Sequence, residues 1–404
     1  MTGALQGIRI FDMSRVLAGP SCTQLLGDLG ADVIKVERPG EGDDTRKWGP
    51  PFLKNAVGQD TEESSYYLSA NRAKRSLTLD FTKPAGRDLA LRLIAQCDVL
   101  VENYKVGTLA RYGLGYEALH RELPRLVYCS VTGFGQNGPY ATRPGYDFLA
   151  QAMGGIMSLQ GEPEGEPMKG AVAVADLMTG MYSAVAILAA LRHRDRTGEG
   201  QQIDMALLDT QVAWLGNQAQ AYLTSGKIPP RLGNAHASVV PYQVFACADG
   251  HIVLACGNDG QFRKFCACAG APELAADARF ATNAARVVNR ALLVPEIARL
   301  IAQRSAAAWI DMLEREGVPC SPINRLDQVF ADPHVQARGM VVPMDHPDAP
   351  APIALLANPI KFSATPVAYR HTPPTLGEHT DTILREMLDL SVSEIAALRA
   401  ARVV

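Results

Sequence analysis

The chain has 404 residues, of which 47% are hydrophobic and 20% are charged, and its formal net charge is -3. This length exceeds that of one ordinary domain, so we expect two or three domains of a globular protein with a large buried core. Nucleic acids and anionic membranes bind concentrated positive charge, and the net charge therefore argues against both as partners.

Three further absences limit the class of protein. The first residues, Met1 to Gly7, lack the basic and then apolar pattern of a signal peptide. The most apolar run, Met178 to Leu191, is too short to span a bilayer and predicts a buried helix. The eight cysteines have no C-x-x-C pair and no nearby pair of histidines, so we expect free thiols, no metal site and a cytoplasmic protein.

Strand and helix patterns alternate through the first half of the chain. Ile8–Phe11 is a short apolar run, and the helical pattern after it has Pro20 near its start and Gly30 at its end. The further strands expected in this half are Asp32–Glu37, Ser76–Asp80, Asp98–Glu102 and Leu126–Val131. Such alternation predicts βαβ units and an α/β fold, a Rossmann-like domain whose parallel sheet is covered on both faces.

The pattern changes after a Gly/Pro-rich connector at Gly226–Gly233. Two β-type runs, Gln243–Cys247 and His251–Ala255, flank Ala-Asp-Gly250, which is typical of a hairpin, and helical patterns follow. We therefore predict a large domain of residues 1–226, completed by residues 331–404, and a smaller α+β domain of residues 227–330.

A nicotinamide-binding domain is the first alternative for a chain that opens with a βαβ pattern, and Glu37 is placed to bind a ribose. The first turn, however, runs from Ser14 to Pro20 without the G-x-G-x-x-G glycines that let a backbone approach a pyrophosphate. A nicotinamide-dependent oxidoreductase is therefore a minor alternative.

Basic residues gather near the ends of the early strands. They are Lys35, Arg38, Arg72, Lys74, Arg75, Lys105 and Arg111. Because the carboxyl ends of parallel strands face one crevice, we expect these side chains to converge there. Arginine and lysine together suit a phosphate-rich ligand, although each residue taken singly fits a solvated surface charge better.

Asp176 is the only charged residue between Lys169 and Arg192, and it lies between an apolar strand-like run and an apolar helix. A carboxylate in such surroundings is costly unless it is paired, caps a helix or takes part in chemistry. One interpretation is an N-cap for a helix that begins at Leu177. The other is a nucleophile.

Two further positions have weaker support. Tyr146 and Asp147 could act as a hydrogen-bond donor and a cap. His236 lies in the connector before Tyr242, where packing explains it as well as chemistry does.

Taken together, these segments resemble the class III CoA-transferases, also called the CaiB/BaiF family. The match runs in order along almost the whole chain. Its motifs are Ala18-Gly-Pro20, Gly27 to Arg38, Gly42 to Arg46, Asn71 to Ser76, Val101-Glu-Asn-Tyr104, Asp176 to Gly180, Thr197 to Gln201 and Leu376 to Thr380.

The resemblance implies a role for each candidate residue. Asp176 matches the family's nucleophile, and Tyr146 and His236 fall near its substrate and lid. The positions that match the CoA-binding region are Arg38, Arg72, Lys74, Arg75, Asn103 and Arg111. The family also implies an interlocked homodimer, coenzyme A thioester as co-substrate, and no tightly bound cofactor.

Within the family, Trp48-Gly-Pro-Pro51, Ala235 to Gln243 and Gly257 to Phe262 are most similar to the members that use succinyl-CoA and glutarate. A dicarboxylic acid is therefore the expected acceptor. The α-methylacyl-CoA racemases of the same superfamily are the main alternative, and they have a histidine where Tyr146 stands here. Tyrosine is a poor base near neutral pH, so Tyr146 favours transfer over racemisation.

Overall fold

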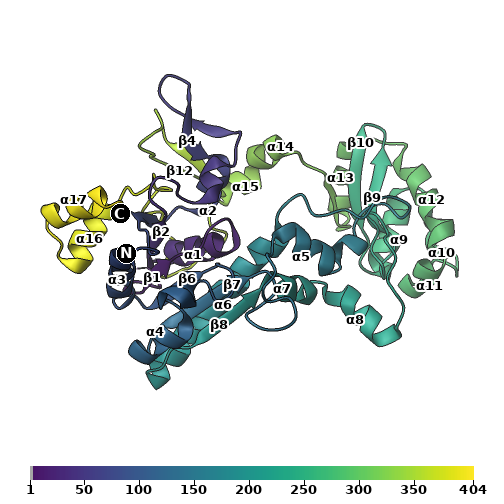
Figure 1. Ribbon diagram of the computed structural model, residues 1–404. Helices are drawn as coiled ribbons and strands as arrows, with labels where there is room; N and C mark the ends of the chain where they lie inside the picture. Colours follow the sequence, from purple (N-terminus) through teal and green to yellow (C-terminus); the bar gives the residue numbers. More distant parts are fainter. Residues whose placement is uncertain (1–2) are drawn as a thin grey trace. The chain divides into compact units, whose positions relative to one another are not determined.

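The computed structural model describes residues 3–404, which form two compact units (Figure 1). Unit 1 contains the described part of Met1–Ile156 together with Gly170–Gln220 and Gln336–Val404, and unit 2 contains Met157–Lys169 and Ala221–Val335. The division thus falls at residues 220 and 335, where the sequence analysis placed it at 226 and 330. That analysis did not assign Met157–Lys169 to the smaller unit.

Unit 1 is built on a six-stranded parallel sheet in the order β5-β2-β1-β6-β7-β8. Its strands are β1 (Arg9–Asp12), β2 (Asp32–Glu37), β5 (Lys74–Thr78), β6 (Val99–Glu102), β7 (Val127–Thr132) and β8 (Gln202–Ala206). The central strands are apolar and buried because helices cover both faces of the sheet. The predicted parallel α/β sheet is confirmed, and β8 is a strand that the sequence analysis did not predict.

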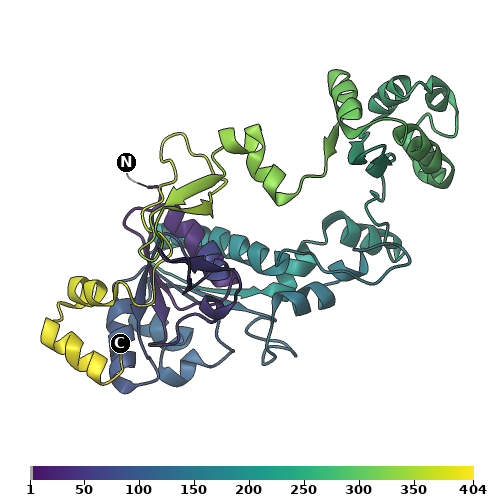
Figure 2. The ribbon, with the colours of Figure 1, turned by 90° about the horizontal axis from the view of Figure 1, so that it is seen from above.

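Helices cover the two faces of this sheet, as Figures 1 and 2 show. One face packs against α1 (Ala18–Asp28) and α6 (Val174–Thr197). The other face packs against α3 (Pro84–Ile94), α4 (Tyr116–Glu122) and α16 (Thr380–Leu388), so the end of the chain completes a core begun by its first strands.

Helix α6 differs from the buried helix that the sequence predicted. Ala184 and Ile187 are buried in the core of unit 1, but Met181, Tyr182 and Val185 are exposed. Among the described residues α6 is the one helix long and apolar enough to cross a membrane by length and composition, a test that core helices of soluble proteins also pass. The expectation that the run is too short for a span concerned Met178–Leu191, which is only part of the longer helix α6.

The remaining elements of unit 1 surround the sheet. They are η1 (Asp44–Lys47), β3 (Phe52–Lys54), β4 (Asp60–Ser64), α2 (Ser65–Ala70), η2 (Leu109–Tyr112), α5 (Asp147–Met153), α7 (Leu207–Ala213), β12 (Val341–Met344), β13 (Ile353–Leu356) and α17 (Val392–Ala400). Short segments at the unit boundaries are η3 (Ile156–Ser158), α8 (Gly216–Ser225) and α15 (Pro333–Ala337).

Unit 2 has an antiparallel sheet in the order β11-β10-β9, made of β9 (Tyr242–Cys247), β10 (Gly250–Ala255) and β11 (Cys320–Pro322). Cys247 pairs with Gly250, so the predicted hairpin is confirmed. The helices of this unit are α9 (Asp259–Cys268), α10 (Pro272–Ala276), α11 (Asn283–Val288), α12 (Arg290–Ile301), α13 (Ala306–Arg315) and α14 (Leu326–Ala331).

Candidate active site

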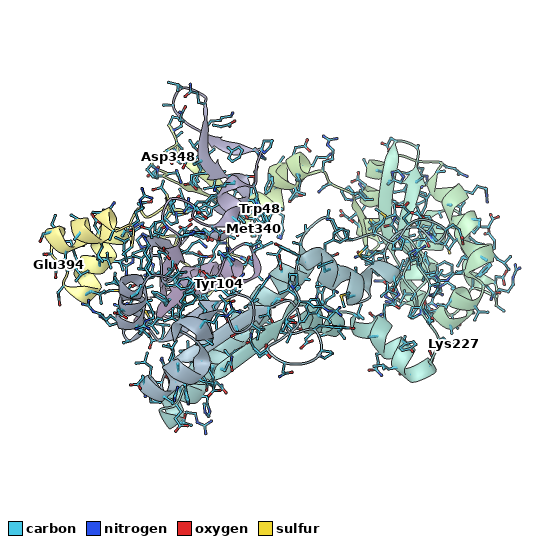
Figure 3. The ribbon with its side chains drawn as sticks, in the orientation of Figure 1. Trp48, Tyr104, Lys227, Met340, Asp348 and Glu394 are labelled. Atoms are coloured by element: carbon cyan, nitrogen blue, oxygen red, sulfur yellow. The ribbon has the colours of Figure 1, made fainter. Side chains whose placement is uncertain are left out.

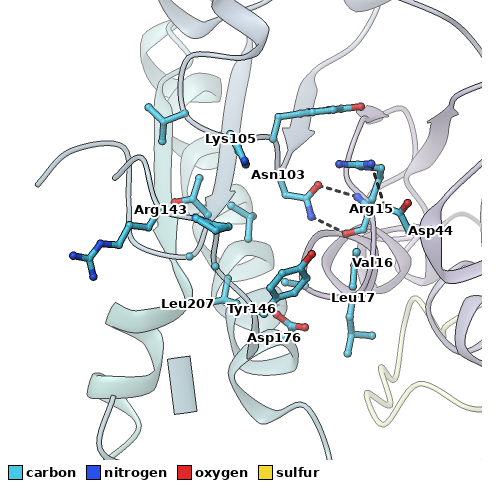
Figure 4. Close-up of a pocket in the computed structure, with 18 of the residues that line it drawn as sticks. Arg15, Val16, Leu17, Asp44, Asn103, Lys105, Arg143, Tyr146, Asp176 and Leu207 are labelled. Atoms are coloured by element: carbon cyan, nitrogen blue, oxygen red, sulfur yellow. Dashed lines mark hydrogen bonds and ion pairs between the residues drawn. The ribbon is translucent and has the colours of Figure 1, made fainter. Parts of the chain in front are cut away.

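A cavity of about 200 Å³ opens in unit 1 at the carboxyl ends of β1, β6 and β7 (Figure 4). Ligands of open parallel sheets bind at this edge. We call it the first cavity. Its walls come from Arg15–Ala18 after β1, Asn103–Val106 after β6, Val131–Gly133 at the end of β7, Arg143–Tyr146 before α5, and Asp44, Ala141, Asp176 and Leu207.

Asp176 is the buried carboxylate of this cavity. It is the third residue of α6, and its exposed fraction is 9%. Burial, followed by the negative charge of Asp147, raises the pKa of its carboxyl group from 3.8 to about 7. An acid whose ionised form is poorly solvated and faces a cavity is suited to act as a nucleophile once it is deprotonated.

The N-cap interpretation of Asp176 is wrong, because α6 begins at Val174 and its first turn is held by a different residue. Asp147 Oδ1 accepts hydrogen bonds from the backbone N–H groups of Ala175 at 2.8 Å and Asp176 at 3.3 Å. Gln151 Nε2 in turn donates to Asp147 Oδ2 at 2.7 Å. The carboxylate of Asp176 is thereby left out of helix capping.

Helices α1 and α6 approach closely beside the cavity. A Cβ atom on Gly180 would lie 2.7 Å from the carbonyl oxygen of Ala18, so only glycine allows this approach. Gly180 is one turn beyond Asp176, and the approach brings the start of α1, with Leu17 and Ala18, to the wall that Asp176 shares.

One aromatic side chain lines the cavity and a second interacts with Asp176. Tyr146 lines it and is 61% exposed. Burial and then the charge of Asp176 raise the pKa of Tyr66, which places that phenol within electrostatic reach of the carboxylate. Trp48, labelled in Figure 3, packs edge-on against Tyr66 with ring centroids 5.2 Å apart. The sequence analysis found Tyr146 but missed Tyr66, for which it offered no signal.

A second cavity, of about 260 Å³, adjoins the first at the carboxyl ends of β2 and β5. The two cavities share Arg15, Asp44 and Tyr104 in their walls. Arg38 lines the second cavity, where Nη1 donates to Glu41 Oε2 at 3.1 Å in an exposed pair. Arg38 therefore lies in a cavity that neighbours the cavity of Asp176.

Arg72, Lys74 and Arg75, three of the basic residues that we expected in this crevice, do not line either cavity. β5 begins at Lys74 and runs parallel to β2, so Arg72 and Arg75 lie at the opposite, amino edge of the sheet, and the expectation that they converge with Arg38 at the carboxyl ends is wrong. The Lys74 side chain does reach the carboxyl end of β1, but its ammonium group is buried against Asp12.

Each of these three residues forms an ion pair inside unit 1. Arg72 Nε and Nη2 donate to Asp28 at 3.0 and 2.6 Å, and Lys74 Nζ donates to Asp12 Oδ2 at 3.2 Å. Arg75 pairs with Asp32 and Glu386. The Arg72 and Lys74 side chains are almost completely buried.

The remaining predicted residues occupy three different settings. Asn103 lines the first cavity, but its carboxamide bonds to the main chain of Arg15. Arg111 is exposed on η2. His236 belongs to unit 2, where its ring packs against Tyr242 and its Nδ1 accepts from the Ser238 N–H. Within residues 3–404, no group of three or more His, Cys, Asp or Glu side chains is arranged to hold a metal ion.

Comparison with known proteins identifies the family to which this fold and site belong. The family model described as CoA-transferase family III matches residues 5–380. The chain belongs to this family. A succinate–glutarate CoA-transferase from Agrobacterium fabrum is 50% identical over 383 residues, which cover 95% of each protein. A succinyl-CoA:glutarate CoA-transferase from Homo sapiens is 44% identical over 400 residues, which cover 99% of this chain and 90% of that protein.

A solved structure agrees with this assignment. A CaiB/BaiF family protein from Brucella suis is 49% identical, with a TM-score of 0.85 over 96% of this chain and 100% of that one. The chain is therefore a CoA-transferase, and acyl-CoA serves this family as a co-substrate. A carboxylic acid is the other substrate that the family implies.

Proposed function

We propose that this CoA-transferase moves CoA from succinyl-CoA to a dicarboxylic acid such as glutarate, with Asp176 as its covalent nucleophile. One observation carries the proposal: Asp176 is a buried carboxylate in a cavity at the carboxyl edge of the parallel sheet. The relatives named for succinate or succinyl-CoA and glutarate support the choice of acids.

The first half of the reaction loads CoA onto the enzyme. An ionised oxygen of Asp176 attacks the thioester carbonyl of succinyl-CoA, the C–S bond breaks, and CoA leaves as a thiolate. The product is a mixed anhydride of Asp176 and succinate. The thiolate then attacks Cγ of Asp176, the C–O bond breaks, and succinate leaves as a carboxylate while an aspartyl-CoA thioester remains.

The second half repeats these steps with the acceptor. A carboxylate oxygen of glutarate attacks Cγ of Asp176 and releases the thiolate, which gives a second mixed anhydride. The thiolate then attacks the glutaryl carbonyl, and Asp176 leaves as a carboxylate. Each step exchanges one acyl bond for another of similar energy, and the partly enclosed position of Asp176 limits the hydrolysis of its intermediates.

The two adjoining cavities support a binding path for CoA. We assign the thioester end to the first cavity, beside Asp176, and the nucleotide end to the second cavity, where Arg38 supplies a guanidinium group. Arg15 lies in the wall between them. Arg111 is exposed on η2 and lines neither cavity.

We also propose a homodimer of interlocked chains. The support is the outer face of α6, where Met181, Tyr182, Val185 and Leu188 expose apolar surface that water solvates poorly. Light scattering during gel filtration tests this proposal, which a monomer of 43.4 kDa would refute.

The function is tested by a transfer assay with succinyl-CoA against a panel of mono- and dicarboxylic acids. Wild type should form the new acyl-CoA with glutarate, and Asp176→Asn should lower kcat by about 10⁴-fold, because an amide cannot form the anhydride. CoA binding measured by calorimetry should change little. Asp88→Asn removes an exposed aspartate of α3 and is the matched control.

Trapping distinguishes this mechanism from its alternatives. Hydroxylamine added with succinyl-CoA should modify Asp176, and an adduct on another residue would refute the nucleophile. A racemase would instead exchange the α-proton of a 2-methylacyl-CoA with no acceptor acid present. Turnover that depends on a nicotinamide would restore the oxidoreductase alternative.

A further inference from the structure

The loop that follows β1 is held from both sides by the loops of neighbouring strands. From the β6 side, Asn103 Oδ1 accepts the N–H of Arg15 at 2.9 Å, and its Nδ2 donates to the carbonyl of the same residue at 2.7 Å (Figure 4). From the β2 side, the N–H of Val16 donates to the two oxygens of Asp43 at 3.2 and 3.3 Å.

A buried ion pair anchors the β2 side. Lys35 Nζ donates to Asp43 Oδ2 at 2.8 Å and to the carbonyl of Ser14 at 3.2 Å, and both charged side chains are fully buried. Three consecutive residues, Ser14 to Val16, therefore have main-chain groups bonded to side chains of adjacent strands. A turn stabilised only by hydrogen bonds within its own main chain would not need these side-chain partners.

The backbone at the centre of this clamp is strained. Val16 has φ +72°, in the left-handed region that a β-branched residue rarely adopts. Such a conformation persists only where the surroundings fix it, and it concentrates at functional sites. Val16, Leu17 and Ala18 line the first cavity together with Asp176, so the strained residue begins the wall that faces the reacting carboxylate.

We propose that Asn103 is a positioning residue for CoA transfer, which holds the Arg15–Val16 backbone so that the Leu17–Ala18 wall stays in place beside Asp176. This inference rests on the proposed function. It changes the role that the sequence resemblance gave to Asn103, from a ligand of CoA to a support of the cavity wall. A ligand would direct its carboxamide at the substrate, whereas here both polar atoms bond to Arg15.

The two roles predict different kinetics for Asn103→Leu, which removes both hydrogen bonds at similar size. A positioning role predicts that kcat with succinyl-CoA and glutarate falls by about 100-fold, while the Kd for CoA stays within about threefold. A CoA ligand predicts the reverse, a higher Kd and KM with little change in kcat. That reverse result would overturn the inference.

A second variant tests the strain directly. Val16→Gly in the Asn103→Leu background removes the Cβ that disfavours φ +72°, so part of the lost kcat should return. No recovery, together with an unchanged Kd for CoA, would assign the loss to another cause and refute the clamp. If Asn103→Leu does not fold by circular dichroism, Asn103→Asp replaces it, since it keeps the acceptor for the Arg15 N–H and removes only the donor.

Asn55→Leu is the matched control. Asn55 also accepts two main-chain hydrogen bonds, from Val57 and Gln59, but in the exposed β3–β4 turn. Its substitution should leave kcat within about twofold. Wild type measured in parallel separates the two hypotheses: an inactive wild type refutes the proposed function, whereas an active wild type with unchanged kcat in both Asn103 variants refutes only the positioning role.

Discussion

Asp12 and Asp176 are both nearly inaccessible carboxylates of unit 1, but their surroundings have opposite effects on the ionised form. Asp12 ends β1 and accepts hydrogen bonds from Ser14, Thr23 and Lys74. Burial alone would raise its pKa, but Lys74, Lys35 and the two hydroxyl groups outweigh burial and hold the pKa below its ordinary value.

Asp176 is also buried, although less completely, and no cation lowers its pKa. Burial and Asp147 act in the same direction, and the pKa rises to about 7. The comparison teaches that burial alone does not distinguish a structural carboxylate from a reactive one. The difference comes from whether neighbouring groups stabilise the charge in the resting protein or leave it to be stabilised during the reaction.

The largest expected effect on stability comes from Asp12→Asn. The substitution leaves Lys74 buried without its carboxylate, and the free energy of unfolding should fall by about 3–5 kcal/mol at pH 7 in urea titrations. Asp381→Asn breaks the exposed pair with Arg399 and should cost less than about 1 kcal/mol. Equal losses of free energy in the two variants would show that burial of the Asp12–Lys74 pair does not increase its contribution to stability.

Asp176→Asn should raise the free energy of unfolding, whereas Asp12→Asn should lower it. The folded pKa of about 7 exceeds the ordinary 3.8, so ionisation of Asp176 destabilises the fold as pH rises from about 4 to 7, and the penalty is complete above pH 7. The variant should therefore be more stable than wild type at pH 8, by up to about 4 kcal/mol. The difference should shrink as pH falls towards 4, and a destabilised variant at pH 8 would contradict the assigned pKa.

The smallest effect is expected from Asp147→Asn, which keeps an oxygen to accept from the start of α6 and removes a negative charge. The pKa of Asp176 should fall, so the rise of kcat/KM with pH should move to lower pH. The other charged or titratable groups of the site are all retained: Tyr66, Tyr104, Tyr146, Asp44, Arg15, Lys105 and Arg143.

Asp209→Asn is the control for this profile, because it removes an exposed carboxylate from the first turn of α7. Its profile should match that of wild type. A profile for Asp147→Asn that stays in place or moves to higher pH would show that Asp147 does not raise the pKa of Asp176.

The fold was predictable where the local pattern alone determines an element. Asp32–Glu37 is a strand in the prediction and in the structure, with Val33, Ile34 and Val36 buried. β8 has only two large apolar residues, Ile203 and Met205, and lies at the edge of the sheet. β5 starts at Lys74, earlier than predicted, because Asp12 compensates a lysine that the local pattern places outside a buried strand.

The site, like the fold, was predictable only where the local residue pattern determines it. Asp176 stood out because its neighbours along the chain are apolar. The bond between Asn103 and Arg15 joins residues 88 positions apart, and the amino-edge location of Arg72 follows from the start of β5. Both depend on strand register, which the residue pattern does not contain.

The division of unit 1 into separate chain segments has a consequence for its synthesis. Arg46 donates to the carbonyl of Pro374, Arg72 to that of Leu356, and Asn358 to Asp28. Proteins emerge from the ribosome with the amino end first. A nascent chain that ends before residue 336 thus contains two buried arginines without these carbonyl partners, so the large unit completes its packing only after the whole of unit 2 has been made.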